Sequence, residues 1–376
     1  MKLKKLDSLF FLFFAFLCIF FYFLQRPLWL DERLILENIK EKSVISILGP
    51  LKNSQAFPRF YLILVKIISE KFNYSNLALR FLPLLFMITA FFVWQKIYKD
   101  QFNSKVSYFL GMLSFISSLR LIYYSNEFKP YSLDVLVVGI FSFYLIRQRN
   151  FLVKNPKLFK FITLILPFSI FFSYASFFVI LLVPISLILL KDKKLLYINL
   201  IYTFLTFLFL SFVFYFDLQY SFREKGLIDY WNDYFLCTKN FYCFFKSFGE
   251  GLRKLVVWWF SDSGISRKIA SFFIPFFVIS LFGYGFTSIK KLKINLESIG
   301  FIIFLELFIF GILKKYPFSG ERITLFFAPF VFYFILRSFE GFKKIKSIYL
   351  ALNIFYFCFI FSCLARSLIL LFFNIR

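Results

Sequence analysis

Apolar stretches long enough to cross a bilayer as helices recur along the chain, and they restrict its fold more than any other feature. Because 60% of the residues are apolar and 66 of the 376 are phenylalanine, the chain has more apolar surface than a soluble core can bury. The sequence therefore predicts an all-α, polytopic membrane protein with about eleven transmembrane helices. The expected spans are residues 9–24, 77–94, 106–123, 131–146, 161–173, 175–190, 195–216, 269–288, 299–313, 323–336 and 348–373.

Lysine and arginine are concentrated in alternate loops between these spans. With the N-terminal MKLKK, the loops QKIYKDQFNSK, RQRNFLVKNPKLFK, KDKK, IKKLKINLES and RSFEGFKKIKS fall on one side, which the positive-inside rule makes cytoplasmic. The net charge of +25 is thus a topology signal, and no nucleic-acid partner is expected. We expect an integral protein of a bacterial inner or plasma membrane, with its site on the periplasmic or extracytoplasmic side.

Two longer segments, residues 25–76 and 217–268, are expected as outer loops of a single transmembrane domain, residues 1–376, without a separate soluble domain. The first is rich in basic residues, contrary to the charge rule, which points to an anionic ligand. Within it, RFYLILVKIISEKF predicts an amphipathic helix along the membrane surface. Its apolar face consists of Phe60, Ile63, Leu64, Ile67 and Ile68.

Histidine is absent, so proton transfer falls to carboxylates, Lys, Tyr or water. Cys237 and Cys243 bracket CTKNFYC in the second outer loop, where a disulfide and two free thiols are both open. The other three cysteines lie in apolar spans and are expected to pack there. A charged residue inside a membrane span usually forms an ion pair or has a functional role. We expect Asp134 to form an ion pair with Arg120.

Charged residues also gather at the outer ends of spans that are far apart in the sequence. They are Asp31 and Glu32 in RPLWLDERLILENIK, Glu127, Lys129 and Tyr131 in SNEFKPY, and Arg322 in YPFSGER. A carboxylate can take the proton of an attacking hydroxyl, while Lys or Arg neutralises a phosphate that departs from an anomeric carbon. Arginine binds phosphate with two parallel hydrogen bonds. The set predicts a reaction on a phosphate-bearing lipid.

In this order, the segments resemble the GT-C superfamily of membrane glycosyltransferases. Besides the acidic pair, the resemblance lies in QAFPRFYLILVKIISEKFNYSNLALRFLPLLF, YYSNEFKPYSLDVL and YPFSGERITLFFAP. It is nearest to the branch of the protein O-mannosyltransferases and the lipid A aminoarabinose transferase. It implies GT-C architecture with interfacial helices in the first outer loop. It also implies sugar transfer from a polyprenyl-phosphate donor to a lipid, glycan or protein acceptor on the non-cytoplasmic face.

The resemblance further implies residue roles. Asp31 matches the family's proposed general base, and Glu32 its companion that orients the acceptor or a metal. Glu127 and Lys129 occupy the acidic and basic places of an E-x-[RK]-P-Y element that ends at Tyr131. A divalent cation is an optional cofactor, with Asp31, Glu32 or Glu127 as its ligands, and the chain lacks the His ligand of some relatives.

Three arginines are candidates for the donor phosphate or substrate. Arg322 matches the family's late arginine, Arg80 lies near the outer end of its span, and Arg59 belongs to the basic first outer loop. Each of these charges also has a structural interpretation, such as a helix N-terminus, a local ion pair or an interfacial arginine. A transporter or flippase of lipid-linked glycans and a non-catalytic subunit of an envelope assembly remain alternatives to an enzyme.

Overall fold

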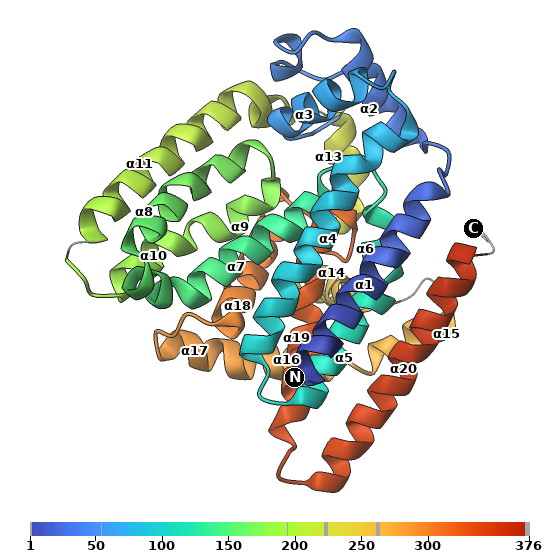
Figure 1. Ribbon diagram of the computed structural model, residues 1–376, viewed down its shortest axis with the longest axis vertical. Coiled ribbons are helices and arrows are strands. Elements are labelled where there is room, and N and C mark those ends of the chain that lie inside the picture. The colour runs from blue at the N-terminus through green and yellow to red at the C-terminus, as the bar shows by residue number, and fades with distance from the viewer. Residues whose placement is uncertain (1, 54, 194, 222–224, 261–263, 373–376) are drawn as a thin grey trace.

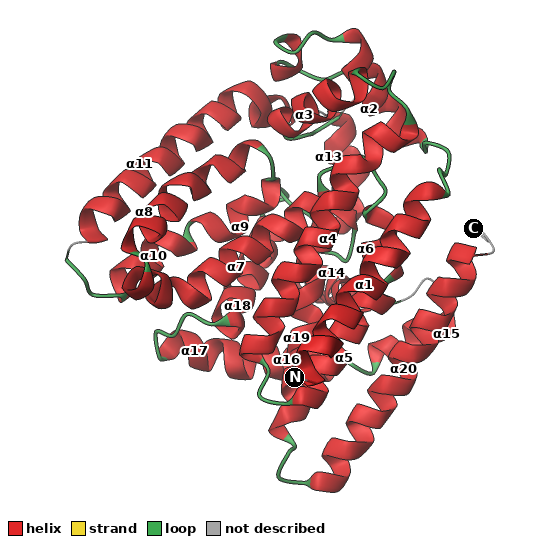
Figure 2. Cartoon of the chain, viewed as in Figure 1, coloured by secondary structure: helices red, strands yellow, loops and turns green. Residues whose placement is uncertain are grey.

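The computed structural model describes residues 2–53, 55–193, 195–221, 225–260 and 264–372. Throughout these ranges the ordered elements are helices, and they contain no strand (Figure 2). The chain is therefore all-α, as its apolar stretches predict. Its helices enclose one contiguous apolar core that is rich in phenylalanine.

Seven helices or helix runs in the described part of the chain are long and apolar enough to cross a membrane. The seven are α1 (Lys2–Phe23), α4 (Asn76–Gln101), α7 (Tyr131–Lys154), α11 (Leu195–Val213) with its continuation to Leu218, the run of α15 (Gly264–Ser271), α16 (Ile274–Ser280) and α17 (Phe286–Lys290), α19 (Ala328–Gly341) with the preceding turn Arg322–Phe327, and α20 (Lys346–Phe372). The prediction of a multi-pass helical membrane protein is confirmed at this level.

The count of eleven spans is not confirmed, because four expected spans form shorter or interrupted helices. Residues 106–123 break at Ser118, whose extended backbone separates two helices. Residues 161–173 pass into a 3₁₀ turn that contains Pro167, which lacks the N–H that an α-helix needs. The shorter helices are α5 (Lys105–Ser117), α6 (Leu119–Tyr124), α8 (Pro156–Ile165), α9 (Phe177–Ile180), α10 (Leu182–Leu189), α12 (Gln219–Ser221), α13 (Lys225–Trp231), α14 (Phe241–Val257) and α18 (Leu296–Ile312).

Helices α4, α7 and α19 form the interior of the helix bundle. Trp94 in α4 donates a hydrogen bond from Nε1 to the Val135 carbonyl in α7, at 3.1 Å. Gly139 lets these helices approach, because a Cβ there would lie 2.9 Å from the Trp94 nitrogen. The Tyr98 hydroxyl donates to the Pro329 carbonyl at 2.6 Å and connects α4 to α19. By contrast, α11 and α20 lie at the flanks and expose apolar side chains (Figure 1).

The segment after α1 folds back over one end of the bundle as α2 (Leu30–Glu41) and α3 (Arg59–Glu70). These helices lie at the top of Figure 1, whereas the connections that follow α4, α7, α17 and α19 lie in its lower half, between the left side and the bottom. In α3, Ile67 is exposed, whereas Arg59 and Lys66 are buried. Lys66 Nζ donates to the Ile39 carbonyl of α2 at 2.7 Å. Two basic residues of this helix thus point into the protein, on a side that also buries Leu62 and Val65.

The structure decides two predictions about polar contacts. Cys237 and Cys243 form a disulfide, with an S–S distance of 2.02 Å. Of the two alternatives that the sequence left open, the disulfide is thus correct and the pair of free thiols is wrong. The expected pair between Asp134 and Arg120 is also wrong. Asp134 accepts a hydrogen bond from Ser173 Oγ at 2.5 Å, and the Arg120 guanidinium lies 4.5 Å from the centroid of the Trp258 indole.

Candidate functional site

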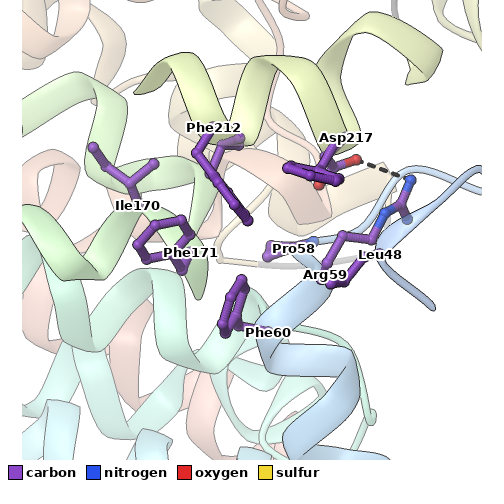
Figure 3. Close-up of a pocket in the computed structure, with 10 residues that line it drawn as sticks. Leu48, Pro58, Arg59, Phe60, Ile170, Phe171, Phe212 and Asp217 are labelled. Carbon is purple, nitrogen blue, oxygen red and sulfur yellow. Dashed lines mark ion pairs between the residues drawn. The ribbon is translucent and has the colours of Figure 1, made fainter. Parts of the chain in front are cut away.

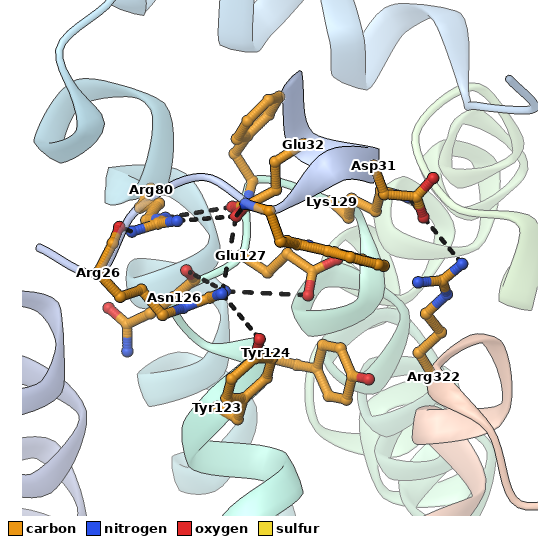
Figure 4. A network of polar contacts seen from close by, with 12 residues as sticks. Arg26, Asp31, Glu32, Arg80, Tyr123, Tyr124, Asn126, Glu127, Lys129 and Arg322 are labelled. Carbon is orange, nitrogen blue, oxygen red and sulfur yellow. Dashed lines mark hydrogen bonds and ion pairs between the residues drawn. The ribbon is translucent and has the colours of Figure 1, made fainter. Parts of the chain in front are cut away.

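Four segments distant in the sequence bring charged side chains together below α2 (Figure 4). The segment that leads into α2 supplies an arginine and an acidic pair, and α4 supplies one arginine. The turn between α6 and α7 supplies an acid and a lysine, and the segment before α19 supplies another arginine. We call this set the charge cluster; its members are Arg26, Asp31, Glu32, Arg80, Glu127, Lys129 and Arg322. Six of the eight predicted site residues belong to it.

Glu32 holds the buried half of the cluster together. Its side chain is fully buried, and it accepts hydrogen bonds from Arg80 Nη2 at 2.7 Å and Arg80 Nε at 3.2 Å. It also accepts from the backbone N–H of Trp29 and of Phe128, each at 3.3 Å. A bidentate Arg–carboxylate pair of this kind is both strong and geometrically specific. Glu32 therefore fixes the start of α2 against α4 and the turn before α7.

Arg26 belongs to the cluster although it was not singled out as a site residue. Its guanidinium donates to the Tyr123 hydroxyl at 2.8 Å and to the Asn126 carbonyl at 3.1 Å. It also lies 3.7 Å from Glu32 and 3.9 Å from Glu127. The sequence signal was its position directly after the first span, where an arginine is more often read as a boundary residue.

Asp31 lies in the more accessible half of the cluster, between two cations. Its Oδ2 is 2.5 Å from Lys129 Nζ and 2.8 Å from Arg322 Nη2. Burial alone would raise the pKa of Asp31, but the charges of Lys129 and Arg322 outweigh burial and hold the pKa below its usual value. A hydrogen bond from Gln55 acts in the same direction. Asp31 is therefore a carboxylate near neutral pH.

The Trp29 indole covers both cations that face Asp31. The Arg322 guanidinium lies 4.7 Å from the indole centroid, and Lys129 Nζ lies 5.5 Å from it. Such cation–π contacts favour the charged forms. Burial nevertheless lowers the pKa of Lys129, against the opposing effects of Glu127 and Asp31. Arg322 also lies 6.0 Å from the Tyr230 ring, so the aromatic segment DYWNDYF reaches the edge of the cluster.

Glu127 is fully buried at the centre of the cluster. Among the described residues, neither of its carboxylate oxygens has a hydrogen-bond partner. Burial raises the pKa of Glu127 to about 7; Lys129 opposes this effect, and Glu32 adds to it. A substantial fraction of this carboxyl is therefore protonated near neutral pH.

The cluster carries an excess of positive charge. It contains four basic and three acidic side chains, which leaves one net positive charge when all are ionised. Protonation of Glu127 would increase this excess. Because the groups lie in a region of low dielectric constant, electrostatic attraction for an anion is much stronger there than in water. Asp31 and Arg322 keep 19% and 13% of their side chains exposed, so an anion would reach the cluster from their side.

Two predicted site residues lie outside the cluster. Arg59 Nη2 pairs with Asp217 Oδ1 at 3.1 Å in a separate cleft (Figure 3). Tyr131 is buried at the cluster's edge, with its ring centroid 6.0 Å from Lys129 Nζ and 5.3 Å from that of Tyr124. Tyr61 connects α3 to the cluster, because its hydroxyl donates to the Lys129 carbonyl at 3.1 Å.

The candidate metal ligands do not form a ready metal site. The part of the chain that the structure describes contains no group of three or more Cys, Asp or Glu side chains placed to hold a metal ion. Asp31 and Glu32 direct their oxygens at lysine and arginine, which compete with any cation. The residues present therefore do not fit a bound divalent cation.

Compared with known proteins, the chain matches no family model, no curated protein and no solved structure. The class of protein is defined by the fold and the charge cluster alone. It is a multi-pass helical membrane protein with a buried, net positive polar cluster at one end of its helices.

Proposed function

We propose that this protein is a glycosyltransferase of GT-C architecture that moves a sugar from a polyprenyl-phosphate donor to an acceptor. In this proposal all eleven apolar stretches cross or enter a bacterial inner membrane, α2 and α3 lie at its surface, and the cluster faces the extracytoplasmic side. The acceptor is a lipid, a glycan or a protein. The observation that supports the proposal best is the meeting of Asp31 with Lys129 and Arg322.

The two cations facing Asp31 suit a phosphate that becomes a leaving group. In the reaction, an acceptor oxygen forms a bond to the anomeric carbon, and the bond from that carbon to the phosphate oxygen breaks. The departing electron pair stays on the phosphate, where Lys129 and Arg322 neutralise its charge. Groups placed to meet charge that develops in the transition state commonly supply about 10²-fold or more in rate.

Asp31 would take the proton that the acceptor hydroxyl loses. In the described structure its pKa is held low by Lys129 and Arg322, which makes it a weak base. A donor phosphate that binds these cations would neutralise their charge and release Asp31 from them. The pKa of Asp31 would then rise, so the base would become active only when the donor is in place. Glu32, Arg80 and Arg26 would position the segments that carry these groups.

The proposal is tested by Asp31→Asn in the purified full-length chain. The assay uses radiolabelled polyprenyl-phosphate sugars as donors, with membranes lacking the chromosomal gene as the source of acceptor. We expect transfer to fall by about 10²-fold or more, with unchanged expression and thermal unfolding. Asp100→Asn, which breaks the exposed pair with Arg147, is the matched control. Wild-type transfer by the Asp31 variant would remove the proposed base.

A further inference from the structure

A narrow cleft outside the charge cluster has one charged end and one apolar end (Figure 3). It lies between the start of α3, the 3₁₀ turn Leu166–Phe171 and the last turns of α11. The cleft is shallow: the space in it and in front of its open mouth totals about 240 Å³, and much of this is open to solvent. Arg59 and Asp217 form the charged end, and Ile170, Phe171 and Phe212 line the apolar end.

The charged end has hydrogen-bonding capacity that the described residues do not use. Arg59 is 4% exposed, and only its Nη2 reaches Asp217, at 3.1 Å. Its Nε and Nη1 have no hydrogen-bond partner among the described residues. Asp217 also accepts a hydrogen bond from the Tyr174 hydroxyl, so this carboxylate does not depend on Arg59 alone. Buried guanidinium N–H groups without acceptors are costly, and a phosphate oxygen satisfies them well.

The order of these groups along α11 follows the order of groups in a membrane lipid. Asp217 lies in a π-helical turn, Phe214–Leu218, at the end of the candidate span, and Phe212 lies deeper. Irregular turns of this kind are frequent at functional sites. The rings of Phe171 and Phe212 are 5.5 Å apart and continue the wall inward, and Phe214 and Tyr215 next to the cleft are exposed. With α11 crossing the membrane as far as Leu218, the charged end would lie at headgroup depth and the apolar end at acyl-chain depth.

We propose that this cleft binds one anionic phospholipid of the phosphatidylglycerol type. Its phosphate contacts Arg59 Nε and Nη1, and the first part of one acyl chain lies against Phe171 and Phe212. This binding is independent of the proposed sugar transfer, because the cleft shares none of its lining residues with the charge cluster. The lipid would hold α3 against α11 and the turn before α9.

The test is titration of the delipidated full-length protein, in neutral detergent, with dioleoylphosphatidylglycerol, followed by native mass spectrometry. Asp217→Asn removes the competing carboxylate, so we expect it to bind the lipid at least as tightly as wild type. The double variant Arg59→Gln with Asp217→Asn leaves no buried charge in the cleft, and we expect about tenfold weaker binding or more. Arg147→Gln, at an exposed pair with Asp100, is the control and should bind normally.

Three results would overturn the proposal. The first is equal binding by Asp217→Asn and the double variant, which would make Arg59 only a structural partner. The second is tighter binding of polyprenyl phosphate than of phosphatidylglycerol at this cleft. The third is failure of a photoactivatable phosphatidylglycerol to label peptides 166–171 or 212–218 of the wild-type protein, a measurement that needs no variant to fold.

Discussion

Asp31 and Glu32 are neighbours in the sequence, yet their surroundings separate their roles. Glu32 is fully buried, and its oxygens bind Arg80 and the backbone N–H of Phe128. Loss of one partner of such a buried pair typically costs about 3 to 5 kcal/mol. Asp31 is partly exposed and faces the two cations that an incoming anion would meet. Glu32 therefore holds three segments together, whereas Asp31 is the acid that the proposed reaction would use.

Glu127→Gln is predicted to change how stability depends on pH. Burial raises the Glu127 pKa from its usual 4.5 to about 7, so the folded state binds more protons than the unfolded state between these values. The contribution of Glu127 to the free energy of unfolding therefore falls as pH rises through this window, by about 3 kcal/mol in all. Glutamine does not titrate, so this contribution is absent from the variant.

The measurement is thermal unfolding of wild type and Glu127→Gln between pH 5 and pH 8. We expect the difference between the unfolding temperature of the variant and that of wild type to increase with pH across this range. The difference should become constant above pH 7. A constant difference between the two proteins would show that Glu127 has an ordinary pKa in the folded state.

At the scale of elements, the segment that carries Arg322 is held by a close approach to α14. A Cβ at Gly320 would lie 2.0 Å from the Lys254 carbonyl oxygen, and a Cβ at Gly251 would lie 2.4 Å from the Phe318 carbonyl oxygen. Both glycines have ordinary negative φ angles, so they are needed for space rather than for backbone conformation. The two backbones can meet only because both positions lack a side chain.

Gly320→Ala is predicted to push this segment away from α14 and to move Arg322, two residues later. We expect a loss of about 1 to 3 kcal/mol in stability, as is typical of overpacking, together with reduced transfer activity. Thermal unfolding and the transfer assay measure the two effects. Gly249→Ala is the matched control on α14, because a Cβ there meets nothing within 4 Å. If both variants unfold like wild type, the close approach is not required.

The elements were only partly predictable from the sequence. Long apolar stretches such as 77–94 and 131–146 became the continuous helices α4 and α7, because hydrophobic length alone identifies them. At Ser118 the backbone is extended and the hydroxyl donates to the Trp259 carbonyl, whereas Pro167 lacks the N–H that an α-helix needs. A count of apolar residues includes neither effect. For α3 the pattern predicted the helix, but not that Lys66 would turn inward to the Ile39 carbonyl.

For the whole molecule, the sequence predicted which charged residues lie together better than it predicted their individual partners. Six predicted site residues meet in one cluster, because the helix ends and turns that carry them lie together at one end of the molecule. The contribution of Arg26 and Trp29, and the pairing of Arg59 with Asp217, were missed. Such contacts join segments that are remote in the sequence, and no local pattern in a single chain encodes them.

The proposed topology predicts which surface positions are accessible from outside the cell. Ser46, in the segment between α1 and α4, and Lys344, between α19 and α20, are both exposed. We expect a membrane-impermeant maleimide to label Ser46→Cys in intact spheroplasts, because this segment lies outside. Lys344→Cys should react only after the membrane is permeabilised, since the positive-inside rule places it in the cytoplasm. The reverse pattern of labelling would place the charge cluster in the cytosol.

Arg322 completes the surroundings of Asp31, but it is synthesised long after Asp31 and Lys129. During translation, Asp31 can first meet Lys129, and the second cation arrives only with the helix that follows Arg322. A nascent chain stalled before that helix would therefore have an incomplete cluster. In the proposed reaction, the departing phosphate would lack one of its two cations until that segment had been inserted.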